Sequence, residues 1–119
     1  DDITQFHIDY SEEGIITAQV KIAQQNTRYK ALINVVDIIK VKANRGCTDD
    51  TVDIKEQGKY YQASYSLNCG LDNKVSKVLV PILENFKTID EVEVEITTPS
   101  SSKHFVLSRQ CDSPIFNVN

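Results

Sequence analysis

Apolar and polar residues alternate strictly in six short segments of this chain, and the pattern leaves few architectures open. A period of two residues predicts β-strands with one side buried and the other in solvent. The segments come in three consecutive pairs, each separated by a few turn-forming residues, and so predict three β-hairpins. In chain order they cover residues 6–10, 16–22, 52–54, 61–69, 91–98 and 103–110.

Matching the apolar sides of neighbouring segments predicts how the first two hairpins pair. In the first, residue 10 lies opposite residue 16, so residues 12–14 form a three-residue loop that ends in a glycine. A left-handed residue that follows a type I turn favours glycine at that position. In the second hairpin, Gln57 and Gly58 form a two-residue turn, and the numbers of paired residues add up to 115.

Two connecting segments have a helical period instead. Over residues 27–45, polar side chains fall on one face of a helical wheel and apolar side chains on the opposite face, and Gly46 can end the helix. Residues 73–88 show a similar apolar stripe. Pro81 lies within this second helix, where it either kinks the helix or begins a shorter one.

The resulting order, ββαββαββ, predicts an α+β fold. We expect a two-layer sandwich in which a mainly antiparallel sheet of about six strands carries two helices on one face. The length of 119 residues predicts a single domain over residues 1–119, with an irregular tail over residues 112–119, where no period is found. No apolar run approaches the roughly 18 residues of a membrane helix, so no membrane span is expected.

Three cysteines allow one disulfide and leave one thiol over. Continuing the ladder of the second hairpin past its end brings residue 47 opposite residue 68, next to Cys69. A one-residue slip at this end predicts a Cys47–Cys69 bridge. A rival pairing of Cys69 with Cys111, which would join the ends of two strands, stays open.

The cellular compartment is predicted from three further features. The chain begins with Asp1 and Asp2, contains no methionine, and has no N-x-S/T glycosylation sequon. With the cysteines, these features favour an extracytoplasmic protein, periplasmic or secreted, from which a signal peptide has been removed. The missing sequon favours a bacterial envelope over a eukaryotic secretory origin.

The charge distribution predicts the kind of partner. A formal net charge of −4 argues against nucleic acid, which needs clustered Lys and Arg, and suits a protein with a basic surface. Outward residues of the fifth segment form an acidic stripe, and those of the fourth form a polar row. The predicted partner-binding residues are Glu91, Glu93 and Glu95 in the acidic stripe and Tyr60, Gln62 and Ser64 in the polar row.

The acidic stripe also has two roles that require no partner. It can be an ordinary solvated face, or it can protect an edge strand from pairing with another chain. In the third hairpin, which carries the stripe, Val94 is predicted opposite Leu107 and Ile96 opposite Phe105. The sequence leaves undecided whether the edge of this hairpin supports a homodimer.

Residues with catalytic chemistry are few and scattered. His7, Asp9 and Ser11 share the outward side of the first strand, but alternate side chains along a strand stand about 7 Å apart and do not converge. His104 lies beside a serine-rich loop. The cysteines and histidines show no short metal-ligand spacing, so neither a metal nor a cofactor is expected.

These features predict a small extracytoplasmic protein-binding module that is not an enzyme. By analogy with size, acidity and chemistry, we expect an inhibitor or immunity-type protein, or an accessory component of a bacterial envelope or secretion assembly. One alternative is a carrier whose helices and curved sheet enclose a small apolar ligand. A second alternative is a small hydrolase that uses His7 or His104.

Overall fold

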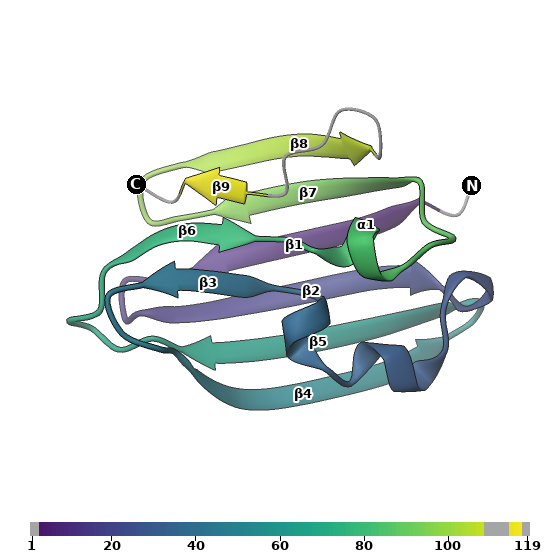
Figure 1. Cartoon of the computed structure of the whole chain (residues 1–119), viewed down its shortest axis with the longest axis horizontal. Coiled ribbons are helices and arrows are strands. Elements are labelled where there is room, and N and C mark those ends of the chain that lie inside the picture. Colours follow the sequence, from purple (N-terminus) through teal and green to yellow (C-terminus); the bar gives the residue numbers. More distant parts are fainter. Residues whose placement is uncertain (1–2, 109–114, 118–119) are drawn as a thin grey trace.

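The computed structural model describes residues 3–108 and 115–117, and within them the fold is mainly β (Figure 1). Six strands form a large sheet: β1 (Thr4–Tyr10), β2 (Ile15–Ala23), β4 (Thr48–Gln57), β5 (Tyr60–Asn68), β7 (Glu91–Thr97) and β8 (Ser102–Ser108). Their order across the sheet is β4-β5-β2-β1-β7-β8. Because β1 and β7 run parallel while the other neighbours run antiparallel, the sheet is mixed.

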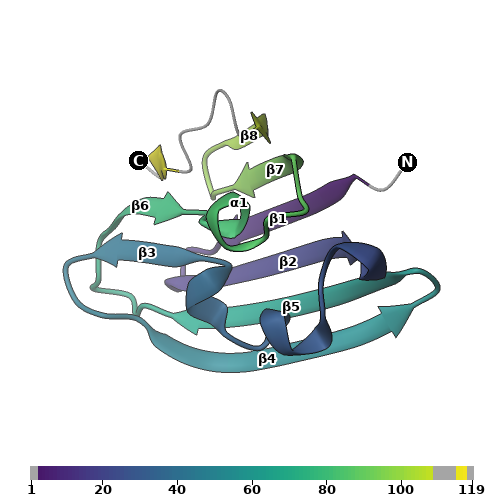
Figure 2. The ribbon, with the colours of Figure 1, turned by 45° about the vertical axis from the view of Figure 1, so that its right-hand side comes forward.

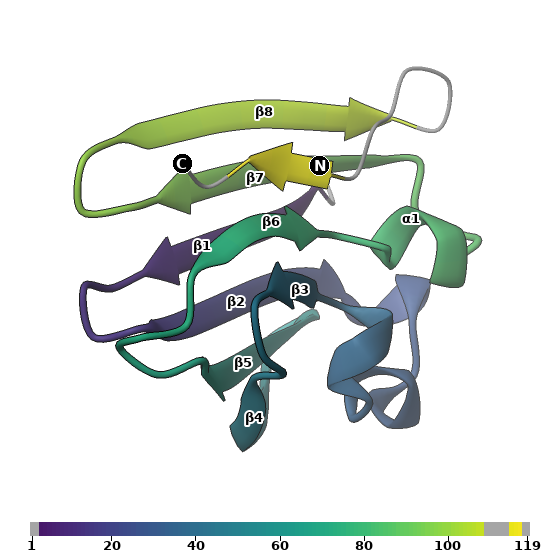
Figure 3. The ribbon, with the colours of Figure 1, turned by 60° about the vertical axis from the view of Figure 1, so that its left-hand side comes forward.

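A smaller second layer covers one face of this sheet. It contains the strands β3 (Lys40–Ala43), β6 (Val75–Leu79) and β9 (Ile115–Asn117), the 3₁₀ turns Gln24–Asn26, Tyr29–Leu32 and Val35–Asp37, and the short helix α1 (Ile82–Asn85). The three strands form a second sheet in the order β3-β6-β9. Figures 2 and 3 show this sheet, the turns and α1 all on the same side of the large sheet.

The hydrophobic core lies between the two layers. The large sheet contributes the apolar side chains whose alternation predicted the strands, and the second layer contributes residues of the turns, β6 and α1. The opposite face of the large sheet is left to solvent. The largest fully buried side chains are Phe6, Ile8, Ile16, Val20, Ile22 and Tyr65 from the large sheet and Leu32, Ile38, Ile39, Val75, Val78 and Ile82 from the second layer.

The predicted helix over residues 27–45 is wrong. This segment contains the second and third 3₁₀ turns, followed by β3. Many of its residues are β-branched valines and isoleucines, whose restricted side chains lower helix propensity. In β3, exposed Lys40 and Lys42 alternate with half-buried Val41 and Ala43, so the apolar residues reach the core from a strand instead.

The predicted helix over residues 73–88 is also wrong. Without the two helices, the predicted α+β fold class is wrong as well, and the fold is mainly β. The segment forms β6 and then, after Pro81, the four-residue helix α1. Proline lacks the amide hydrogen that a continuous helix needs, so the helix begins only after it, close to the shorter helix predicted as the alternative. Within the described residues, no helix is long and apolar enough to span a membrane.

The first hairpin pairs as predicted, with Tyr10 opposite Ile16. Gly14 closes its loop with a φ of 81°, in the left-handed region. Ser11 shapes the same loop, because its Oγ accepts hydrogen bonds from the backbone amides of Glu13 and Ile15, both at 3.3 Å. The loop is therefore fixed by one glycine and one hydroxyl, and the alternation sets the register beside it.

The other two hairpins keep the predicted faces but differ in register by two residues. In the second, the turn is formed by Gly58 and Lys59, so paired numbers add up to 117 along most of the ladder. Gly58, with a φ of 62°, occupies the first turn position, where a positive φ is needed. In the third, Leu107 lies opposite Val92 instead of Val94. A shift of two residues returns each side chain to the same face, so alternation cannot detect it.

The C-terminal segment contains one element that the sequence did not indicate. An irregular tail is predicted over residues 112–119, yet Ile115–Asn117 form β9 and pair with β6. Three residues are too few to establish a period of two. The leftover Cys111 lies outside the described residues.

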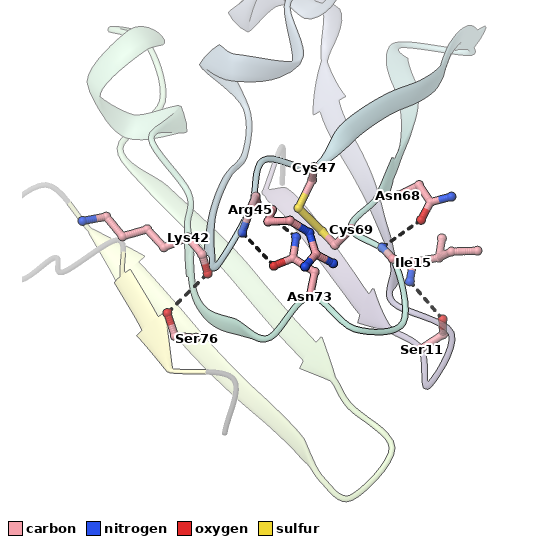
Figure 4. Close-up of a disulfide and its surroundings, with 10 residues drawn as sticks. Ser11, Ile15, Lys42, Arg45, Cys47, Asn68, Cys69, Asn73 and Ser76 are labelled. Atoms are coloured by element: carbon pink, nitrogen blue, oxygen red, sulfur yellow. Dashed lines mark hydrogen bonds between the residues drawn. A yellow bond between two sulfur atoms is a disulfide. The ribbon is translucent and has the colours of Figure 1, made fainter.

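The predicted Cys47–Cys69 disulfide is present (Figure 4). The β4–β5 register shifts by one residue between Asp49 and Thr51, as predicted in size but in the opposite direction, because the observed ladder starts from a sum of 117 instead of 115. At the resulting sum of 116, residue 47 falls opposite residue 69. The rival pairing of Cys69 with Cys111 is thereby excluded.

A second link joins the same corner of the molecule. The buried side chain of Asn73 donates to the Arg45 carbonyl oxygen at 2.8 Å and accepts from the Arg45 amide at 2.9 Å (Figure 4). Arg45 closely precedes Cys47, and Asn73 closely follows Cys69. The two chain segments are thus joined by one covalent bond and by two hydrogen bonds beside it.

Replacing Tyr65 by phenylalanine is expected to lower the free energy of unfolding by about 1–2 kcal/mol. Tyr65 is buried, and its hydroxyl donates to the carbonyl oxygen of Leu32 at 2.5 Å, linking β5 to the second layer.

Burial also raises the pKa of Tyr65 above the ordinary tyrosine value of about 10. The folded state therefore holds this proton more tightly than the unfolded state does. The resulting stabilisation is complete below about pH 10 and is lost as the pH rises further.

Urea unfolding of the wild type and of Tyr65→Phe at neutral and alkaline pH measures both effects. We expect the wild type to lose stability more steeply above about pH 10 than the variant, which lacks this titrating group. Parallel losses in the two proteins would contradict the assignment of the alkaline effect to Tyr65.

Candidate functional site

The open face of the large sheet carries all six residues predicted to bind a partner. They are Glu91, Glu93 and Glu95 on β7 and Tyr60, Gln62 and Ser64 on β5. The two strands are not neighbours, because β2 and β1 lie between them. At about 4.8 Å between neighbouring strands, the two groups stand about 14 Å apart. Any shared site must therefore include side chains of β1 and β2.

The position of β7 rules out edge protection as the role of the acidic stripe. β7 is an interior strand, flanked by β1 and β8, so its glutamates do not protect an edge. In the part of the chain that the structure describes, the edges of the large sheet are β4 and β8. It is β4 that carries the dense charge typical of a guarded edge, in Asp49, Asp50, Asp53, Lys55 and Glu56.

Outward side chains of neighbouring strands line up in two rows that cross the sheet. The first wall consists of Gln62, Lys21, Gln5 and Glu93. The second wall consists of Ser64, Gln19, His7, Glu95 and His104. Between the walls runs the backbone of Ala63, Val20 and Phe6, whose buried side chains belong to the core. We call the space between the two walls the trough.

The trough is a hollow of about 400 Å³ bounded by these residues. It extends over five strands, from β5 to β8, which corresponds to a length of about 19 Å at the usual strand spacing. Four of the predicted residues line it, namely Gln62, Ser64, Glu93 and Glu95. Glu91 and Tyr60 share the open face but do not line the trough.

The end of the trough near β7 is acidic, and its two carboxylates are held by side chains of β1. His7 Nδ1 lies 2.8 Å from Glu95 Oε1, and Gln5 Nε2 donates to Glu93 Oε2 at 3.5 Å. His7 and Glu95 are both close to half exposed, at 43% and 48%. This exposure keeps the energetic value of the pair small, and its main effect is to orient the Glu95 carboxylate.

A positive charge lies beside the middle of the trough, on the outer side of the first wall. The Lys21 ammonium lies 4.4 Å from the centre of the Tyr60 ring, within the range of a cation–π interaction. Tyr60 is only half buried, so this contact contributes little energy, and its main effect is to orient Lys21. Tyr60 therefore contributes to the site by supporting Lys21, because the lysine already occupies one side of its ring.

The hydrolase alternative gains no support from the geometry. Ser11, which shares one strand side with His7 and Asp9 in the sequence pattern, uses its hydroxyl in the first hairpin loop (Figure 4). Ser64 lines the trough, but Gln19 lies between it and His7 in the second wall. Among the described residues, no group of three or more His, Cys, Asp or Glu side chains is placed to hold a metal ion.

Five of the side chains that form the two walls are absent from the predicted partner-binding set. They are Gln5, Gln19 and Lys21, together with His7 and His104, for which the sequence suggests only catalysis. Alternation indicates that these side chains point outward, and that signal is in the sequence. Their alignment with Glu93 and Glu95 depends on the parallel β1–β7 pairing, which no local pattern predicts. The chain matches no protein-family model and no curated protein, so the site is interpreted from its geometry.

Proposed function

We propose that this protein is a small, non-enzymatic protein-binding module and that the open face of the large sheet, centred on the trough, is its binding surface. The observation that carries the proposal is the trough itself, in which polar side chains from five strands line one hollow with both charges present. Such side chains can supply the direct hydrogen bonds that a typical protein–protein interface contains.

The compartment and class of the module are part of the proposal. The Cys47–Cys69 disulfide supports an oxidising, extracytoplasmic location, periplasmic or secreted. An inhibitor or immunity-type protein, or an accessory component of a bacterial envelope or secretion assembly, fits a small acidic domain that presents one rigid face. The acidic end of the trough suits a partner with a basic surface.

The carrier alternative has lost its basis. It depended on apolar stripes along two helices, and those segments form 3₁₀ turns, β3, β6 and α1 instead. The trough is lined by amide, hydroxyl and charged side chains, which an apolar ligand would have to desolvate without compensation.

Reversing the charge of Glu93 and Glu95 to lysine is expected to abolish most partner capture while shifting the melting temperature by only a few degrees. The two side chains are accessible to solvent and contact neighbours by weak surface interactions, so their replacement leaves the core intact. The measurement is a pull-down from envelope and secreted fractions with the oxidised protein as bait, read by mass spectrometry.

Glu12 and Glu13 supply a matched control. Both are exposed in the first hairpin loop, away from the trough, and their double replacement by lysine changes the net charge by the same amount. One partner captured by the wild type and the loop variant, and lost with Glu93→Lys/Glu95→Lys, is the expected result. Equal losses in both variants would show that only net charge matters and would overturn the proposed surface.

A further inference from the structure

We infer that the trough takes an extended peptide segment of its partner, with a basic side chain at the Glu93–Glu95 end and an acidic side chain at Lys21, three residues away along the segment. The inference rests on the proposed protein-binding function and specifies the partner's chemistry. It is carried by the arrangement of opposite charges in the first wall, whose backbone spacing the strand registers fix.

The two carboxylates at the acidic end suit a cation with several hydrogen-bond donors. Glu93 belongs to the first wall and Glu95 to the second, about 7 Å apart along β7, so their carboxylates flank the trough. Gln5 and His7 each engage one oxygen of these carboxylates. Among the described residues, the other oxygens, Glu93 Oε1 and Glu95 Oε2, have no hydrogen-bond partner. A guanidinium group, with its fork of donors, can bridge two such oxygens, whereas an ammonium offers a more compact point charge.

At Lys21 the ligand must instead provide a negative charge. Its ammonium group offers three donors and lies above Tyr60 on the outer side of the first wall, so a carboxylate that reaches over this wall meets an oriented cation. Lys21 and Glu93 lie in the same wall, separated by Gln5, which places their backbones two strand spacings or about 10 Å apart. A peptide segment that pairs with both residues must carry its own charged residues about that far apart.

The remaining lining favours a peptide backbone between those charges. Gln5, Gln19 and Gln62 present amide acceptors and donors, although one donor of Gln5 is engaged by Glu93. These groups match the alternating carbonyl and amide groups of an extended chain. In a polyproline II segment, residues i and i+3 lie on the same side about 9 Å apart, close to the Lys21–Glu93 spacing. The length of about 19 Å holds about six residues of such a segment.

A spacing series of peptides tests the inference directly. The probe is the capped hexapeptide Gly-Arg-Ser-Ser-Glu-Gly, compared with hexapeptide analogues in which Arg and Glu are from one residue to five apart, and with a neutral analogue carrying Gln at both positions. Binding to the ¹⁵N-labelled, oxidised protein is followed by amide chemical shifts. We expect shifts at residues of the trough, and affinity about five- to tenfold higher at the three-residue spacing than for the neutral analogue.

Substituting Lys21 tests the charge arrangement. Lys21→Glu should reverse the preference, so that a peptide with Arg at both positions binds more tightly than the Arg/Glu peptide. Lys55→Glu is the control, because Lys55 lies next to Gln62 across the β4–β5 pair but outside the trough. It should leave the wild-type preference unchanged. The spectrum of each variant verifies that it is folded.

The outcomes separate this inference from the proposed function. Affinity that is flat across the spacing series, or a preference that Lys21→Glu leaves unchanged, overturns the inference. If the pull-down partner still depends on Glu93 and Glu95 in that case, the protein-binding proposal stands and the partner uses a different segment. Loss of both the spacing optimum and the Glu93/Glu95 dependence overturns both.

Discussion

Gly14→Ala is expected to destabilise the protein by about 3–4 kcal/mol, a large share of the roughly 5–15 kcal/mol by which a domain is ordinarily stable. Two costs add at this position. The residue has a φ of 81°, which an L-residue with a side chain adopts only with strain. A methyl group there would also stand 2.3 Å from the carbonyl oxygen of Gly70 and 2.6 Å from its carbonyl carbon.

The backbone has little freedom to relieve that clash. The Cys69 amide donates to the Gly14 carbonyl oxygen at 2.8 Å, so the loop is held against the segment it would collide with. Cys69 is in turn tied to Cys47 by the disulfide. Moving Gly70 away therefore disturbs a hydrogen bond and a cross-linked corner together.

Gly58→Ala provides the matched control. Gly58 also has a positive φ, of 62°, but a methyl group there meets no atom within 4 Å. Its replacement should cost only the conformational strain, about 1–2 kcal/mol. Urea unfolding of the two variants separates the strain of the positive φ from the contact with Gly70. Equal destabilisation would show that this contact does not contribute to the loss of stability.

Removing the disulfide is the second large expected effect, a loss of about 3 kcal/mol. The bridge closes a loop with a sequence separation of 22, and opening it increases the conformational entropy of the unfolded chain. Cys47→Ser/Cys69→Ser is best compared with the wild type in a Cys111→Ser background, which prevents exchange with the third thiol. The measurement is the free energy of unfolding by urea.

Binding offers an independent check on the disulfide variant. β4 does not line the trough, so the folded fraction of Cys47→Ser/Cys69→Ser should bind the Arg/Glu hexapeptide with unchanged affinity. A loss of stability well under 1 kcal/mol would mean that the Asn73–Arg45 pair alone holds the corner closed.

The strands of the large sheet could be predicted because alternation is a direct consequence of having one buried face. Tyr65 and Val94 are buried while Ser64 and Glu95 face solvent, as their positions in the pattern indicate. Pairing within the second and third hairpins could not be settled this way, since a shift of two residues preserves the pattern. The conformation of Gly58 set the register of the second hairpin.

The second layer could not be predicted because short apolar segments fit more than one structure. Val35, Ile39 and Ala43 lie on the apolar face of a helical wheel, but they also suit 3₁₀ turns followed by a short strand. The β-branched composition favoured the latter. Pro81 carried the correct signal for its segment, since it separates β6 from α1.

The site was predictable only as two separate groups of residues. The outward positions of Gln62 and Glu93 follow from alternation, but their membership of one trough depends on which strands lie between them. That order includes the pairing of β1 with β7, two strands far apart in the chain. Long-range strand order is a property of the packed core and has no local signature.

The parallel pairing of β1 with β7 also has a consequence for the order of folding. Gln5 and Glu93 are 88 residues apart in sequence, so the acidic end of the trough joins the first strand to a strand that follows both of the first two hairpins. Contacts of such high order form slowly, and a chain in which only the first two hairpins have folded leaves one side of β1 unpaired. The trough is therefore complete only once β7 has joined the sheet.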